Sequence, residues 1–332
     1  MTATFLDLVD LASERLGAAV IAANDEFFAP KERLIRAAAP IWIEGKYTER
    51  GKWMDGWETR RRRDEGDHDW CIVRLGVPGI VRGVDVDTAF FKGNYPESCA
   101  IDACDTTMVA TADDLARAPW REIVPRTPLK GDSHNPIAAA GSARTTHLRL
   151  RIFPDGGVAR LRVHGEVTAD WDRLRRRGDV DLAAVEHGGL VTGCSDMFFG
   201  SRHNLIMPGD ATHMGDGWET KRRRGPGHDW TIIRLASAGT IRRVEVDTRH
   251  FKGNAPGACS LEGAVLEPDR DEDDLAWRDL LPRTALQPDT KHLFEDDLRA
   301  AGDVTHVRFN IYPDGGVGRL RLFGRPRQEH AS

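Results

Sequence analysis

Apolar and polar residues alternate with a period of two along much of the chain. Leu148, Leu150 and Ile152 alternate with Arg149 and Arg151. The same alternation recurs at residues 84–87, 244–247 and 307–312. A period of two is typical of a β-strand with one buried face. We therefore predict half-buried strands, and helical signal is thin by comparison.

Turn residues separate these segments. Pro154–Gly157 and Pro313–Gly316 both read Pro-Asp-Gly-Gly, which predicts a hairpin between the flanking strands. A short helix is expected within residues 5–23, and single helical turns at 113–118 and 271–275. Short strands joined by turns predict an all-β chain made of antiparallel β-sandwiches. Periodicity alone does not distinguish a plain sandwich from a jelly roll.

The chain is an internal duplication. Trp57–Arg63 recurs, with one Arg replaced by Lys, as Trp218–Arg224. Two longer segments recur without a gap, 68–94 as 228–254 with 16 of 27 positions identical, and 145–165 as 304–324 with 13 of 21. A period of about 160 residues is a whole domain rather than a solenoid unit. We predict a first domain at 1–168, a linker at 169–189 and a second domain at 190–332, with Trp57 equivalent to Trp218.

Composition excludes several classes of function. Lys and Arg total 47 against 52 Asp and Glu, so no basic excess favours nucleic acid as a partner. No apolar run approaches the roughly 20 residues of a membrane span. The five cysteines include no CxxC pair, which argues against a disulfide framework or structural zinc. We expect a protein of the reducing cytoplasm, with no nucleic-acid or membrane partner.

The first repeated motif is Trp-Glu-Thr followed by basic residues, with Glu58 and Glu219 as its carboxylates. A carboxylate beside a row of guanidinium groups can hold an anionic substrate. The alternative is a surface strand whose charges pair with one another, and the motif taken alone favours that alternative.

The second repeated motif is His-Asp-Trp, which begins at His68 and at His228. A histidine beside a carboxylate can serve as a general acid or base. Successive strand residues point to opposite faces, so a His–Asp dyad forms only if the backbone turns there. The alternative, a strand entry with a packed Trp, is equally supported.

The third repeated motif, Asp-Thr-x-x-Phe-Lys-Gly-Asn, places three kinds of polar group on one loop after a strand. Its candidates are Asp87, Lys92 and Asn94, and in the second repeat Asp247, Lys252 and Asn254. Loops at strand ends commonly carry sites. The alternative is a turn stabilised by Asn and Gly, and the convergence of polar groups favours a site.

The fourth repeated motif, Thr-His-x-Arg, puts Arg149 and Arg308 on strand faces where a guanidinium can bind a carboxylate. An outer sheet face in water is an equal alternative. No P-loop, GxGxxG, HExxH or nucleophile-elbow pattern occurs, and no spacing of His, Cys, Asp or Glu demands a metal.

Taken together and in order, these motifs resemble the allantoicase family. The resemblance rests on Gly66-x-His-Asp-Trp70, on Val86–Asn94, on Phe153–Val158 and on their second copies. It covers nearly the whole chain. One departure is visible: residues 42–52 match a shorter segment, 208–213, in the second repeat. We expect this insertion to alter a loop rather than the fold.

The resemblance implies a function and a fold. Allantoicases hydrolyse allantoate to ureidoglycolate and urea in purine breakdown through allantoin. Each family repeat is a jelly-roll-like β-sandwich of the galactose-binding type, and the proteins are soluble homo-oligomers that act on a small-molecule ureide. Manganese has been associated with some members, so metal dependence is open. The alternatives are a non-catalytic small-molecule or carbohydrate-binding protein, and a chain with one catalytic and one structural repeat.

The expected chemistry assigns roles to the repeated residues. Glu58 or Glu219 is the first candidate to activate water, with Asp87, Asp247, His68 and His228 as alternative acids or bases. The cations Lys92, Lys252, Arg149 and Arg308 are candidates for the substrate carboxylate, and Asn94 and Asn254 for its ureido groups. We expect the Lys-Gly-Asn loop to lie close to Glu58 and His68 in the first repeat, and the second repeat to match.

Overall fold

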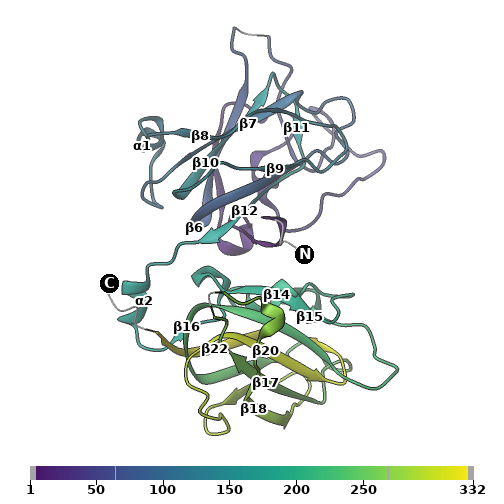
Figure 1. Cartoon of the computed structure of the whole chain (residues 1–332). Helices are drawn as coiled ribbons and strands as arrows, with labels where there is room; N and C mark the ends of the chain where they lie inside the picture. The colour runs from purple at the N-terminus through teal and green to yellow at the C-terminus, as the bar shows by residue number, and fades with distance from the viewer. Residues whose placement is uncertain (1–4, 64, 268, 328–332) are drawn as a thin grey trace. The chain divides into compact units, whose positions relative to one another are not determined.

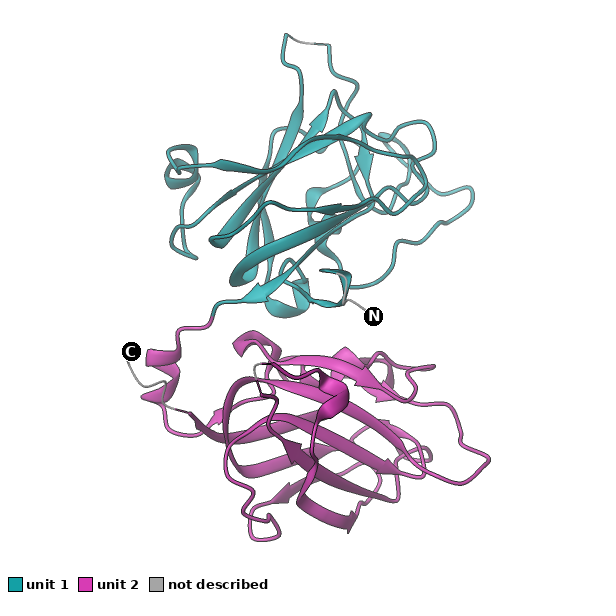
Figure 2. Cartoon of the chain, viewed as in Figure 1, with its two compact units in different colours: residues 1–168 teal, residues 169–332 magenta. Residues whose placement is uncertain are grey.

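The chain forms two units of similar architecture, Met1–Thr168 and Ala169–Ser332, shown in Figures 1 and 2. This computed structural model describes residues 5–63, 65–267 and 269–327. Each unit contains one eight-stranded sheet and one additional two-stranded sheet, and the first unit also has a small two-stranded hairpin. Within the described residues, the strand pairs of both large sheets are antiparallel. The predicted all-β, jelly-roll-like fold is confirmed.

The first unit is built from short strands around one long strand. Its strands are β1 (Val9–Asp10), β2 (Ala19–Ala23), β3 (Tyr47–Thr48), β4 (Gly51–Lys52), β5 (Trp57–Glu58), β6 (Asp69–Asp87), β7 (Ser98–Cys104), β8 (Arg121–Pro128), β9 (Pro136–Ala138), β10 (Arg144–Phe153), β11 (Gly157–Val158) and β12 (Arg160–Val167). Its helical segments are η1 (Phe5–Asp7), η2 (Glu14–Leu16), η3 (Lys31–Ile35) and α1 (Ala112–Ala116).

The second unit repeats this order. Its strands are β13 (Val180–Asp181), β14 (Leu190–Cys194), β15 (Trp218–Glu219), β16 (Asp229–Asp247), β17 (Ala258–Ala264), β18 (Arg278–Ala285), β19 (Lys291–Phe294), β20 (Val304–Tyr312), β21 (Gly316–Val317) and β22 (Arg319–Pro326). Its helical segments are α2 (Trp171–Arg175), η4 (Val185–His187), η5 (Arg202–Ile206), η6 (Met214–Asp216) and η7 (Glu272–Asp274).

The long strand β6 serves both layers of its sandwich. Its first part, residues 71–74, pairs with β2 and β10, while residues 83–85 pair with β9 and β12. Between these parts, a Cβ on Gly79 would lie 2.5 Å from the carbonyl oxygen of Glu166, so only glycine fits there. In the second unit β16 has the same role, and Gly239 meets the carbonyl oxygen of Arg325 at 2.3 Å.

The predicted equivalence of the repeats is visible in matched contacts. Trp57 and Trp218 are both fully buried, and each indole N–H donates to a backbone carbonyl, of Asp25 and of Asp196, at 2.8 Å. The predicted alternation also holds, because Leu148, Leu150 and Ile152 are fully buried in the core. Fully burying such a side chain contributes about 1.5–3 kcal/mol.

The expected helix within residues 5–23 was wrong. The segment instead contains η1, β1, η2 and β2. Gly17, with a φ of 84°, ends η2 after one turn, and residues 19–23 then pair with β6. Pairing with a buried strand outweighs a helical preference that is weak in so short a segment.

The hairpin expected at Pro154–Gly157 was also wrong. The turn leads from β10 to β12, and these two strands both pair with β6 rather than with each other. Its last residue belongs to β11, which pairs with β5. The second copy, Pro313–Gly316, behaves in the same way between β20 and β22. The turn therefore connects two parts of the sheet and supports β5 as it does so.

The segment 169–189, predicted as a linker, is largely structured. It contains α2, and β13 within it pairs with β22 of the second unit. The sheet of that unit therefore begins ten residues before the predicted boundary at 190. The single helical turns expected at 113–118 and 271–275 correspond to α1 and η7.

Two further observations concern membrane-spanning helices and the state of the cysteines. Among the described residues, no helix combines the length and apolar character needed to cross a membrane. All five cysteines are free thiols, and four of them are buried.

Candidate active site

A cavity of about 770 Å³ lies in the first unit. Its lining residues are Phe28, Trp42, Glu44, Lys52, Met54, Glu58, Phe90, Lys92, Gly93 and Asn94. Three of them, Glu58, Lys92 and Asn94, were predicted from the repeated motifs. A concave site that combines apolar walls with a few polar groups is the usual form of a small-molecule site.

Strand β5 fixes Glu58 at the cavity. The backbone of Glu58 pairs with Gly157 of β11 and with Ala29. The neighbouring Trp57 is fully buried and anchored by its bond to the carbonyl of Asp25. Because successive strand residues point to opposite sides, burying Trp57 directs Glu58 to the other side, into the cavity.

The Lys-Gly-Asn loop brings an amide to this carboxylate. Asn94 Nδ2 donates to Glu58 Oε1 at 2.7 Å. The backbone of Asn94 is fixed as well, since its carbonyl accepts from the N–H of Gly157 at 2.7 Å. Beneath them the buried Phe91 ring occupies the space that a side chain at Gly157 would need, with Cε1 1.9 Å from an ideal Cβ. The glycine and the Phe of the repeated motifs therefore position Asn94.

The same loop holds an unusual backbone conformation in both repeats. Phe90 has a φ of 68° and His250 a φ of 73°, which is rare for residues other than glycine. The backbone N–H of each donates to an aspartate, Asp132 at 2.7 Å and Asp289 at 2.8 Å. Such conformations persist where surrounding structure enforces them, and they concentrate at functional sites.

Two features of the surroundings of Glu58 act on the pKa of its carboxyl group in opposite directions. Only 8% of Glu58 is exposed, and this burial raises the pKa of its carboxyl group. The hydrogen bond from Asn94 favours the ionised form and opposes part of that effect. The expected guanidinium row does not intervene, because Arg60 pairs with Asp25 at 2.8 Å and Arg62 with Asp69.

The second unit contains the same carboxylate–amide pair in a more open setting. Asn254 Nδ2 donates to Glu219 Oε1 at 2.5 Å, and Glu219 is half-buried. The two predicted loop lysines are also equivalent in their contacts. Lys92 lies 3.9 Å from Asp132, and Lys252 lies 3.8 Å from Asp289.

The predicted proximity of His68 to the Glu58 site was wrong. His68 is not among the residues that line the cavity. Its Nδ1 lies 2.5 Å from Asp67 Oδ1, and its ring packs against Phe153. His228 lines a different cavity, of about 480 Å³, where its Nε2 lies 3.2 Å from Asn310 Oδ1. The two histidines therefore pack against aromatic residues at the ends of β10 and β20, while the Asp69 side chain contacts Asn24 and Arg62.

The predicted arginines are neutralised by carboxylates of the sheet. Arg149 pairs with Asp102 at 2.8 Å, and Arg308 pairs with Glu262 at 2.6 Å. Arg149 does not line the Glu58 cavity, and Arg308 lines the same 480 Å³ cavity as His228. This placement matches the outer-face alternative for the Thr-His-x-Arg motif.

The predicted aspartates also lie outside the Glu58 cavity. Asp87 is buried, accepts from the N–H of Ala89 at 2.8 Å and lines an adjoining cavity of about 370 Å³ with Asp85 and His134. Burial raises the pKa of Asp87. Asp247 instead pairs with Arg249 through both carboxylate oxygens, Oδ1 accepting from Nε and Oδ2 from Nη2.

Sequence reasoning missed the contribution of the insertion at 42–52. Trp42, Glu44 and Lys52 come from this insertion, and all three line the cavity. The insertion forms the β3–β4 hairpin, whose flanking Trp53 is buried. The sequence does show these residues as a segment without a full match in the second repeat. The candidate site residues, however, were chosen among those that the two repeats share.

The described residues do not fit a manganese site. No group of three His, Cys, Asp or Glu side chains in the described ranges is arranged to hold a metal ion. The two cavity carboxylates each accept a hydrogen bond, Glu58 from Asn94 and Glu44 from Trp42 Nε1 at 2.8 Å. We therefore derive no step through a metal.

Comparison with known proteins agrees with this architecture. The family model described as "Allantoicase repeat" matches residues 9–168 and 180–327. The chain belongs to the allantoicase family. The two matches correspond to the two units, and the second begins at β13, where the second sheet begins.

Relatives along the full length support the same membership. The chain is 49% identical over 329 residues to "Probable allantoicase" of Pseudomonas aeruginosa, covering 98% of each chain. It is 48% identical to "Probable allantoicase" of Photobacterium profundum, covering 96% of this chain and 97% of the other. The crystal structure of allantoicase from Saccharomyces cerevisiae is similar with a TM-score of 0.81 and 36% identity, covering 95% of this chain and 92% of that one.

Proposed function

We propose that the chain is an allantoicase, a hydrolase of C–N bonds that converts allantoate and water to ureidoglycolate and urea. Family membership over both units supports the reaction. The observation that carries the site is the buried Glu58–Asn94 pair lining the 770 Å³ cavity. We place the reaction in that cavity.

The reaction replaces one C–N bond of the substrate by a C–O bond. The oxygen of water bonds to the carbon that carries both ureido groups, the bond to one ureido nitrogen breaks, and urea leaves. One proton must leave the water and one must reach the departing nitrogen. A single carboxyl group can do both in turn, as base and then as acid.

Glu58 is suited to that transfer. Asn94 occupies Oε1, and no described residue donates to Oε2, which remains available to water. Because burial raises the pKa of Glu58, its carboxylate is a stronger base than an exposed one, and the acid form that returns the proton is present in a larger fraction near neutral pH. The apolar walls formed by Phe28, Met54 and Phe90 supply this burial.

The direct test is release of urea from allantoate by the purified full-length chain. We expect urea and ureidoglycolate in equal amounts, with turnover unchanged after treatment with a chelator. Binding of allantoate without release of urea, with and without added manganese, would instead support the non-catalytic binding protein. A requirement for manganese would contradict a mechanism carried by Glu58 alone.

We further propose a homo-oligomer in the reducing cytoplasm. The five free thiols, four of them buried, suit a reducing compartment. Phe198 and Phe199, which are 71% and 63% exposed, provide apolar surface for contact between copies. Light scattering on the intact chain, compared with the Phe199→Ser variant, tests this assembly.

A further inference from the structure

The two repeats share the Glu–Asn pair but differ in the segment that covers it. In the first unit, residues 42–52 form a hairpin that supplies Trp42, Glu44 and Lys52 to the cavity wall. In the second unit, the matching residues 208–213 read Pro-Gly-Asp-Ala-Thr-His and contain neither Trp nor Lys. Any function of these three side chains therefore belongs to the first repeat alone.

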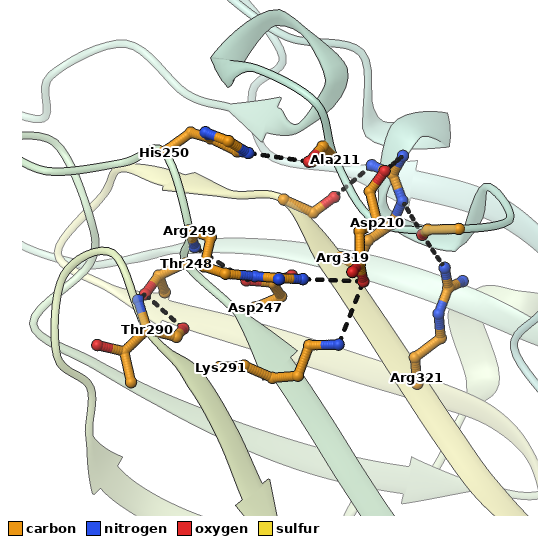
Figure 3. Close-up of polar contacts among 12 residues, drawn as sticks. Asp210, Ala211, Asp247, Thr248, Arg249, His250, Thr290, Lys291, Arg319 and Arg321 are labelled. Atoms are coloured by element: carbon orange, nitrogen blue, oxygen red, sulfur yellow. Dashed lines mark hydrogen bonds and ion pairs between the residues drawn. The ribbon is translucent and has the colours of Figure 1, made fainter.

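The short segment of the second unit, residues 208–213, forms hydrogen bonds and ion pairs with other residues of the same unit (Figure 3). Asp210 accepts from Arg249 at 2.8 Å and from Lys291 at 3.2 Å, and the carbonyl of Ala211 lies 2.9 Å from His250 Nε2. Further bonds reach its backbone from Arg319 and Arg321. These contacts fix the position of the segment. They also pair the four neighbouring cations with oxygen atoms of the protein, so these cations are less available to bind an anion.

In the first unit, one cavity cation is left without a carboxylate. The cations that line the cavity are Lys52 and Lys92. Lys92 lies 3.9 Å from Asp132, and its side chain is 78% exposed. For Lys52, no carboxylate of the described ranges lies within ion-pair distance. Its Nζ instead lies 4.2 Å from the centre of the Trp42 ring, so a cation–π contact holds the ammonium at the wall.

The aromatic platform beneath Lys52 is itself fixed. Trp42 Nε1 donates to Glu44 at 2.8 Å, and the Trp42 ring lies 6.1 Å from the ring of Phe90. The ring also packs against the small cluster that contains Met54. Two carboxylates, Glu44 and Glu58, face the same cavity, and they would repel an anionic substrate unless a free cation offset them.

We infer that the first repeat alone binds substrate productively, and that Lys52 binds the substrate carboxylate. This inference rests on the proposed function, because allantoate supplies the carboxylate. Lys52 determines specificity for an anionic ureide, whereas Glu58 acts at the carbon that bears the ureido groups. The assignment replaces Lys92, Arg149 and Arg308 as the principal carboxylate partner.

The test compares Lys52→Gln and Lys52→Arg with a matched control, Lys46→Gln. Lys46 belongs to the same insertion and its Nζ also lies 4.2 Å from a Trp ring, that of Trp53, but it does not line the cavity. Steady-state kinetics gives KM and kcat for allantoate, and calorimetry gives Kd. The neutral carboxamide analogue of allantoate serves as a second ligand.

Lys52→Gln should raise KM and Kd for allantoate about 10- to 100-fold, the worth of a charge-assisted hydrogen bond. Its kcat should change less. Lys52→Arg should retain most of the affinity, Lys46→Gln should match the parent, and binding of the carboxamide should not respond to Lys52→Gln.

The experiment distinguishes failure of the Lys52 assignment from failure of the proposed function. If the parent releases urea and Lys52→Gln stays within twofold of Lys46→Gln, the Lys52 assignment is overturned while the proposed function stands. If the parent binds allantoate without releasing urea, and Lys52→Gln still weakens that binding, the proposed reaction is overturned while Lys52 stands. If allantoate neither reacts nor binds, both are overturned.

Discussion

Asn94 donates its amide N–H to Glu58 at 2.7 Å, across 36 positions of sequence, and the second repeat reproduces the bond between Asn254 and Glu219 at 2.5 Å. In the first repeat, burial raises the pKa of Glu58, and this hydrogen bond lowers the pKa and so opposes that effect. The amide therefore both aims the carboxylate and limits how strongly it holds a proton.

Replacing Asn94 should shift the pH dependence of turnover. Catalysis requires ionised Glu58, so kcat/KM falls as pH drops through the raised pKa of that residue. Asn94→Ala removes a hydrogen bond that favours the ionised form, so the pKa rises further and the acid limb moves to higher pH. A kcat/KM–pH profile checks this shift. An acid limb that stays in place or moves to lower pH would contradict it, and Asn254→Ala, expected to leave the profile unchanged, is the matched control.

Glu58 should lower the stability of the fold at neutral pH. Its folded pKa is raised, so the folded state binds more protons than the unfolded state between the ordinary and the raised pKa, and stability falls as pH rises through that window. Glu58→Gln removes the buried charge and should raise Tm at pH 7 but not at pH 4. Calorimetry at both pH values measures this difference. An equal change of Tm at the two pH values would show that ionisation is not the cause.

The buried pair of Arg160 and Asp55 should stabilise the first unit. Arg160 is 1% exposed, and its Nη2 donates to Asp55 at 2.8 Å. Burial alone would raise the pKa of Asp55, but the bonds from Arg160 and from the N–H of Ile41 outweigh it and lower that pKa. Arg160→Met leaves the buried Asp55 carboxylate with only the more distant Arg36, at 3.8 Å, and the N–H of Ile41. Removing the buried partner costs about 3–5 kcal/mol in free energy of unfolding.

Denaturant unfolding measures that loss, with Arg162→Met as the comparison. Arg162 lies 3.6 Å from Asp10, and its side chain is 20% exposed, so its replacement should cost clearly less. Equal losses for the two variants would show that the Arg160–Asp55 pair contributes no more to the free energy of unfolding than the more exposed Arg162–Asp10 pair.

The shared part of the site was predictable because duplication marks it. Glu58 and Asn94 both belong to motifs that recur, and the glycines and the Phe beside them recur with them. Their convergence needs only that β5 and the loop after β6 meet. The backbone bond from Gly157 to Asn94 joins them in the first repeat, and the bond from Gly316 to Asn254 does the same in the second.

Other parts of the site depend on long-range packing that a local pattern does not encode. His68 has suitable chemistry, yet its ring packs against Phe153, because the register of β6 against β10 sets Asp69 opposite Ile152. Arg149 appears free in sequence, and only the register of β10 against β7 places Asp102 opposite it. Trp42 and Lys52 were not predicted as site residues because they lie in the insertion, and a comparison of the repeats selects only residues that both contain.

The most direct test of the account is the kcat for urea release by Glu58→Gln and by Glu219→Gln, measured beside the parent chain. The two variants replace a carboxylate by an amide in equivalent hydrogen-bonded pairs, so each controls for the other. Loss of a general base or acid typically lowers rate about 10²–10⁴-fold. We predict a loss of that size for Glu58→Gln and a change of less than about threefold for Glu219→Gln. Near-normal turnover by Glu58→Gln, or equal losses in the two variants, would contradict catalysis by Glu58 in the cavity of the first repeat.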